Sequence, residues 1–166
     1  MNQRPGPEEA KSYYFRYIDR VPEVDILEFL NQQQDTALRL WRAIPEEQAA
    51  QPYGPGKWTF KQLVAHLNDW ERIFVARAMT FARGVPGPMP GFEPDEILAA
   101  SGADERSWSS HVEEFEAVRR STVTFFRYLP EQAWSRQGIA SGDAFSVRAL
   151  AHLAAGHVEH HLTALK

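Results

Sequence analysis

Histidines are the side chains of this sequence whose spacing points most directly to chemistry. Four of the six lie within the last fifteen residues, and the other two stand alone in the middle of the chain. His157 and His161 are four positions apart, so both would project from one face of an α-helix. They continue an apolar row formed by Leu150 and Leu153, which predicts that both rings face the protein interior.

A third histidine stands in a similar setting on another segment. His66 lies between Leu63 and Trp70 in a second apolar row. Burying an imidazole is costly unless its ring nitrogens find partners, so three inward-facing rings indicate a shared cation. Three protein ligands with one open position are typical of catalytic zinc sites. We therefore predict a divalent-metal site formed by His66, His157 and His161.

Interpretations of the same histidines that involve no metal stay open. A pair four residues apart is weak evidence alone, and a single histidine in an apolar row is more often a hydrogen-bonded core residue. His160 lies one position off the row and is the reserve ligand, whereas we interpret His111 and His152 as surface or packing residues. The carboxylates that are candidates to orient the ligand rings are Asp69, Glu71 and Glu159.

Two further polar residues are candidates to orient a substrate or cofactor beside the metal. Gln34 stands in the middle of the first apolar row, and Arg77 follows His66 by eleven residues on the same predicted face. Arg77 is either an anion clamp near the metal or a partly buried ion pair. Arg119 and Arg120 are expected on a solvated face with one of them paired. No Ser-His-Asp arrangement, glycine-rich phosphate loop or HExxH motif is present.

Four segments carry the apolar repeat of amphipathic helices. Thr59 and Gln62 are spaced as a capping box before the second segment, Gly84 is placed to end it, and Ser146 is a candidate N-cap for the fourth. The alternation typical of strands is absent. The sequence therefore predicts an all-α fold, a four-helix bundle. The predicted helices cover about residues 24–44, 60–83, 104–129 and 146–166.

One predicted connection is unusually long for a bundle. About twenty residues, 84–103, join the second helix to the third, and connections of that length usually serve a purpose. We expect a crossover, a lid over the site, or both. Residues 1–12 are polar and contain proline and glycine, so we predict a flexible tail there and a single domain over residues 13–166.

The composition is that of a globular protein and excludes several function classes. The formal charge is −4 over 166 residues, which disfavours binding to nucleic-acid phosphates. No cysteine is present, so disulfides, thiolate metal sites and cysteine nucleophiles are excluded. Membrane-spanning and signal-peptide segments are not recognised. We expect a cytoplasmic protein that acts on a small-molecule substrate, without nucleic-acid or membrane partners.

Several stretches of the sequence together carry a resemblance to a known family. In this combination the chain, from about residue 13 onward, resembles the DinB-like family and its bacterial branch of short stand-alone domains. The stretches are Tyr17-Ile18 with Val21-Pro22 and Asp25, PGKWTFKQLVAHLNDWERIFVARAMTFARG from Pro55 to Gly84, PGF from Pro90 to Phe92, and AGHVEHHLTAL from Ala155 to Leu165.

The resemblance implies a four-helix bundle with a long crossover connection between helices two and three. By motif position it implies a site for nickel or zinc at His66, His157 and His161. It further implies a homodimer and, from better-understood relatives, a transferase or isomerase whose metal activates a low-molecular-weight thiol. In many relatives Arg-Gly-Gln follows the last histidine, whereas Leu162-Thr163-Ala164 follows it here.

Three functions are compatible with these residues. The first is a metal-dependent transferase or hydrolase that activates a thiol or water for attack on a small electrophile entering beneath residues 84–103. The second is a non-catalytic stress-response or interaction protein that a metal stabilises. The third is a helical interaction module without a metal, in which replacing each of the three histidines has only small and unrelated effects on the metal content.

Overall fold

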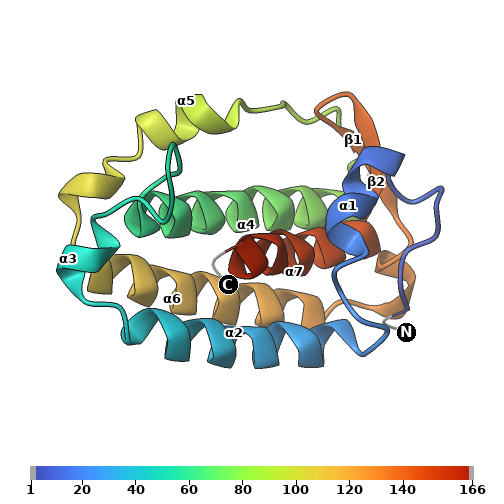
Figure 1. Ribbon diagram of the computed structural model, residues 1–166. Helices are drawn as coiled ribbons and strands as arrows, with labels where there is room; N and C mark the ends of the chain where they lie inside the picture. The colour runs from blue at the N-terminus through green and yellow to red at the C-terminus, as the bar shows by residue number, and fades with distance from the viewer. Residues whose placement is uncertain (1–2, 165–166) are drawn as a thin grey trace.

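The computed structural model describes residues 3–164, and long helices dominate it (Figure 1). The four-helix bundle predicted from the apolar repeats is confirmed. Its long helices are α2 (Ile26–Arg42), α4 (Phe60–Ala82), α6 (Trp108–Arg127) and α7 (Val147–Ala164). The shorter helices are α1 (Phe15–Ile18), α3 (Glu46–Ala49) and α5 (Pro94–Ala99), with 3₁₀ turns at Ser12–Tyr14, Ala103–Glu105 and Glu131–Ala133.

Local signals in the sequence set the ends of the helices. The hydroxyl of Thr59 accepts a hydrogen bond from the Gln62 amide, and the Gln62 side chain accepts one from the Thr59 amide, both at 3.1 Å. This is the predicted capping box. Gly84, with φ +83°, follows the end of α4 in the left-handed region. Ser146 accepts a hydrogen bond from the Ala149 amide and starts α7 as predicted.

The directions of the four long helices explain the long connection. Figure 1 shows α4 and α6 running the same way, with α2 and α7 running opposite to them. The chain must therefore return along the molecule between α4 and α6, and α5 belongs to this crossover. α4 packs against both α6 and α7, and α2 packs against the same two helices. The antiparallel pairing of α4 and α7 brings the beginning of α4 beside the end of α7.

The predicted absence of strands is wrong in the connection before α7. β1 (Gln137–Ala140) and β2 (Asp143–Ser146) form an antiparallel hairpin. Its turn residues, Ser141 and Gly142, have φ values of 53° and 79°, as tight hairpin turns require. Strands of four residues are too short for alternation to be recognised in the sequence.

The described part of the predicted tail contacts the body of the protein. Ala10 forms a β-bridge with Phe145. Ser146 donates two hydrogen bonds to Glu9, one from its amide to the carbonyl oxygen at 2.9 Å and one from its hydroxyl to the carboxylate at 2.6 Å. Residues 1–2 lie outside the described residues. The segment before α1 is therefore attached to the start of α7.

Buried apolar side chains form the core in two clusters. The larger cluster includes Leu150 and Leu153 of α7 with Phe81 of α4, and the smaller one surrounds Trp41 and Trp108. The apolar faces of the long helices thus pack against one another. Within residues 3–164, no helix has both the length and the hydropathy needed to cross a membrane.

Candidate metal centre

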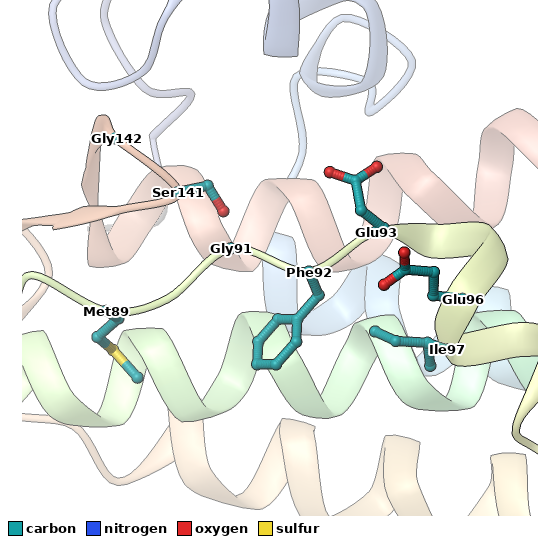
Figure 2. Close-up of a pocket in the computed structure, with 8 residues that line it drawn as sticks. All are labelled: Met89, Gly91, Phe92, Glu93, Glu96, Ile97, Ser141 and Gly142. Atoms are coloured by element: carbon teal, nitrogen blue, oxygen red, sulfur yellow. The ribbon is translucent and has the colours of Figure 1, made fainter.

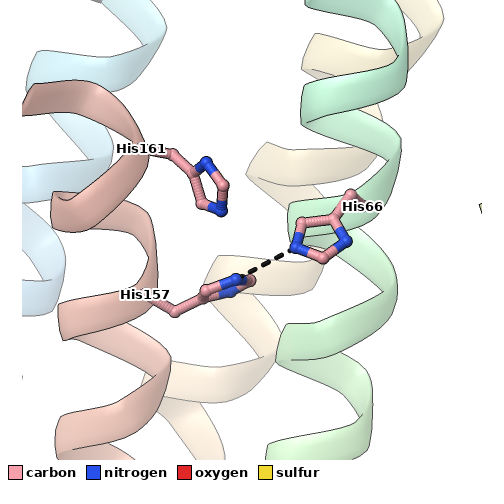
Figure 3. A group of neighbouring side chains, drawn as sticks. All are labelled: His66, His157 and His161. Carbon is pink, nitrogen blue, oxygen red and sulfur yellow. Dashed lines mark hydrogen bonds between the residues drawn. The ribbon is translucent and has the colours of Figure 1, made fainter. Parts of the chain in front are cut away.

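Three histidine side chains from two helices point toward one another inside the bundle (Figure 3). His66 comes from the second turn of α4, and His157 and His161 come from the C-terminal part of α7. The Nε2 atoms of His66 and His157 are 3.0 Å apart. One ring nitrogen from each of the three residues lies within 4.8 Å of the others. The structure therefore brings together the three residues selected by their spacing, here called the histidine triad.

Burial favours the neutral form of the histidine triad. His66 and His157 are 7% and 8% exposed, and His161 is half-buried. Burial lowers the pKa of His66 to about 4 and holds the pKa of His157 well below its usual value. Burial, followed by the charges of His66 and His160, lowers the pKa of His161 to about 3. At neutral pH each ring therefore keeps a lone pair, which is the form that binds a metal.

Aromatic side chains form walls around the histidine triad. The ring centroid of Trp58 lies 4.8 Å from that of His66, and the centroids of Tyr17 and Phe74 lie 5.7 and 5.9 Å from that of His157. Trp58 and Tyr17 were not predicted as site residues. A single tryptophan is most simply a core residue, and no spacing rule relates residue 17 to residue 157. These walls limit the access of water to the rings.

The carboxylates predicted to orient the rings have other partners. Within residues 3–164, no hydrogen bond joins any of them to the histidine triad. The rings are therefore held by packing against the aromatic walls and by the 3.0 Å hydrogen bond between the Nε2 atoms of His66 and His157. The partners of the carboxylates are Arg72 for Asp69, Arg119 for Glu71 and Gln33 for Glu159.

A buried arginine, Arg119, links three of the long helices, α2, α4 and α6. Both carboxylate oxygens of Glu71 accept hydrogen bonds from Arg119 at 2.8 Å, and Arg119 is 0% exposed. The same guanidinium donates to the carbonyl oxygen of Leu30 at 3.2 Å and to the side chain of Gln33 at 2.9 Å. The prediction of a solvated position is therefore wrong for Arg119. It is correct for Arg120, which is exposed.

Gln33, and not its neighbour Gln34, extends the network to α7. The Gln33 amide donates to the carbonyl oxygen of Ala155 and to the carboxylate of Glu159, each at 3.0 Å. Gln34 is half-buried, and its side chain has no hydrogen-bond partner among residues 3–164. Leu30, Leu38 and Trp41 of the predicted row are buried, but Gln33 and not Gln34 is the buried glutamine between them. A role for Gln34 toward a substrate stays a prediction.

Arg77 attaches the crossover to α4. It lies about 16 Å along the helix axis from His66. Its guanidinium donates to the carbonyl oxygen of Pro90 at 3.0 Å and to the hydroxyl of Ser141 at 2.8 Å. It forms no ion pair with any carboxylate that the structure describes, so the expected ion pair is wrong. Its role toward a substrate or cofactor stays a prediction.

The other histidines have separate environments. His111 and His152 are buried, and one ring nitrogen of each lies 2.8 and 3.0 Å, respectively, from a backbone carbonyl oxygen. This confirms that both are packing residues. His160 is half-buried, with its ring centroid 5.0 Å from that of His161. Its part as a reserve ligand stays a prediction.

The crossover and the hairpin turn form a separate pocket of about 550 Å³. Figure 2 shows the side chains of Met89 and Phe92 pointing toward α4, while Glu93 and Glu96 supply carboxylates. No histidine lines this pocket, so it is distinct from the candidate metal centre. Its lining residues are Met89, Gly91, Phe92, Glu93, Glu96, Ile97, Ser141 and Gly142.

Comparisons with known proteins agree with this architecture. A family model described as the DinB superfamily matches residues 30–165. One similar solved structure is YfiT from Bacillus subtilis, described as a probable metal-dependent hydrolase with an unusual four-helix bundle topology. The TM-score is 0.69 at 18% sequence identity, and the alignment covers 97% of this chain and 90% of that one. At this identity the likeness shows the fold alone. The search of curated proteins found no match.

Proposed function

Because the chain belongs to the DinB superfamily, as the resemblance of its motifs predicted, we propose that it is a divalent-metal-dependent enzyme acting on a small molecule. The reaction is a hydrolysis or a transfer in which water or a low-molecular-weight thiol is the nucleophile. The observation that carries this proposal is the convergence of His66, His157 and His161 within 4.8 Å. The description of YfiT as a probable metal-dependent hydrolase supports water as the nucleophile.

The donor set of the histidine triad fits a divalent cation. Two nitrogens that each bind one zinc ion at about 2.0–2.1 Å are at most about 4.2 Å apart. The nitrogens of His66 and His157 are 3.0 Å apart, and the whole set lies within 4.8 Å, so small rotations of the rings would suffice. Neutral imidazoles suit zinc and nickel, which are the metals that we propose.

The chemistry divides between the metal and the side chains around it. A bound divalent cation acts as a Lewis acid and lowers the pKa of a water molecule or thiol at its open position. Trp58, Tyr17 and Phe74 enclose the rings, while the half-buried His161 marks the side open to solvent. Because the chain has no cysteine, any thiol must arrive as a small molecule. A cytoplasmic homodimer is part of this proposal through the family resemblance.

Elemental analysis of protein purified without a histidine tag or added metal tests the site. We expect about one divalent metal per chain, and a loss of most of it in His66→Ala, His157→Ala and His161→Ala. His152→Ala is the matched control, because His152 is buried on the same helix outside the histidine triad. Equal metal content in all four variants would contradict the site.

Turnover measurements then distinguish the enzyme from a metal-stabilised protein. The metal-loaded and metal-free forms are assayed against ester substrates and against electrophiles with a panel of thiols. Turnover by the loaded form alone supports the proposal. A metal that raises the melting temperature without any turnover supports the non-catalytic alternative.

A further inference from the structure

Helix α1 contacts α7 directly beside the histidine triad. An ideal Cβ atom on Gly156 would lie only 2.1 Å from the carbonyl oxygen of Tyr17, so the two backbones touch one residue before His157. The ring of Tyr17 is edge-on to His157 and His160, with centroid distances of 5.7 and 5.3 Å. The residues of α1 therefore belong to the surroundings of the candidate metal centre.

Two arginines extend from this contact toward solvent. The guanidinium carbon of Arg16 lies 5.2 Å from the ring centroids of both Tyr13 and Tyr17, a cation–π arrangement that fixes its position. The Nε of Arg20 donates to the carbonyl oxygen of Arg16 at 3.2 Å. Both side chains are exposed. They are thus held on the side of the histidine triad formed by α1.

The positive charges of Arg16 and Arg20 are not neutralised within residues 3–164. Neither guanidinium lies within 4.0 Å of a described carboxylate. The acidic residue that immediately precedes Arg20, Asp19, pairs with Arg4 instead. On a chain with net charge −4, this leaves a local positive surface beside the site.

The ring of Tyr17 joins the arginines to the histidine triad. Its centroid lies 5.2 Å from the guanidinium carbon of Arg16 and 5.3 Å from the ring centroid of His160, and the ring of His160 is 5.0 Å from that of His161. His160 and His161 are both half-buried. The guanidiniums therefore lie on the half-buried side of the histidine triad, where a substrate would approach.

We propose that Arg16 and Arg20 form an anion-binding rim of the metal centre, so that the substrate carries a carboxylate or phosphate group. This inference rests on the proposed metal-dependent function and names the substrate class of that site. Paired guanidiniums recognise such oxyanions by charge and hydrogen bonds. The reacting end of the substrate reaches the histidine triad while its anionic end stays at the rim.

Binding of two thiols to the cobalt(II)-loaded full chain tests the rim. The probes are 3-mercaptopropionate, which carries a carboxylate, and 3-mercapto-1-propanol, which carries a neutral hydroxyl in its place. The thiolate-to-cobalt absorption band reports the affinity of each thiol. We expect the anionic thiol to bind about 2- to 10-fold more tightly, and this preference to decrease with added salt.

The double variant Arg16→Gln, Arg20→Gln should bind both thiols equally. Arg39→Gln, at an exposed position on α2, is the matched control and should keep the preference.

The outcomes separate the rim from the metal centre. Equal affinities in the unmodified protein would overturn the rim, as would a preference that persists in the double variant, since the carboxylate would then be binding elsewhere. A cobalt spectrum that His66→Ala leaves unchanged would overturn the metal-dependent function itself and the rim with it.

Discussion

Arg119 and its neighbour Arg120 show how burial decides the contribution of an arginine side chain to the stability of the protein. Its guanidinium is 0% exposed and bonded to Glu71, Gln33 and the backbone of Leu30. A buried charge is tolerated only when its partners are in place. The next residue, Arg120, is exposed and lies 3.3 Å from Glu116 on the same helix, an arrangement of small energetic value.

Replacing Arg119 with alanine would leave the carboxylate of Glu71 buried without its partner. We expect the free energy of unfolding to fall by about 3–5 kcal/mol, measured by urea denaturation. Arg119→Lys keeps the positive charge but cannot form the bidentate hydrogen bonds to Glu71, so it should show an intermediate loss of unfolding free energy. Arg120→Ala is the control and should leave stability nearly unchanged. Equal effects at the two positions would contradict the buried network.

At the scale of elements, the contact between α1 and α7 depends on a glycine inside a helix. Gly156 lies within α7, where glycine is less favourable than alanine. The backbone of α1 occupies the space where a side chain at this position would lie, 2.1 Å from the carbonyl oxygen of Tyr17. The glycine thus lets α1 place Tyr17 and its neighbouring arginines beside the metal centre.

Gly156→Ala separates helix propensity from packing by the sign of its effect. Propensity alone predicts a gain of about 1 kcal/mol. We expect instead a loss of about 1–3 kcal/mol, because α1 must move away from α7. Thermal denaturation measures the sign, and the metal affinity of the variant should fall as the wall formed by Tyr17 moves. A stabilised variant would show that α1 does not pack as described.

At the scale of the whole molecule, buried histidines make stability depend on pH. The pKa values of His66 and His152 are lowered to about 4, and that of His161 to about 3, mainly by burial. In the unfolded chain a histidine has a pKa near 6.5. Between these values the unfolded state binds protons that the folded state excludes, so the free energy of unfolding falls as the pH is lowered.

The metal-free protein should therefore lose stability between pH 7 and pH 5, above the range in which most carboxylates titrate. The largest slope is about 1.4 kcal/mol per pH unit for each proton, measured by urea denaturation at several pH values. His152→Gln removes one such group outside the histidine triad and should make the dependence shallower. A profile that is flat over this range would contradict the buried, neutral state of the histidines.

Much of the fold and the candidate site was predictable from local patterns. The capping box of Thr59 and Gln62, the N-cap at Ser146 and the glycine after α4 fixed helix ends, because capping involves residues only a few positions apart. The apolar repeats defined four long helices. The four-residue spacing of His157 and His161 set their common face by helix geometry alone.

Local sequence patterns were therefore enough to predict the four long helices, most of their buried faces and the three histidines that point inward. Three features came only from the three-dimensional packing: the burial of Gln33 in place of Gln34, the burial of Arg119 against Glu71, and the position of α1 beside α7. These features depend on contacts between residues far apart along the chain, and helix periodicity carries no information about such contacts. Those contacts are fixed only when the helices pack around a common core, which sets the direction and rotation of each helix.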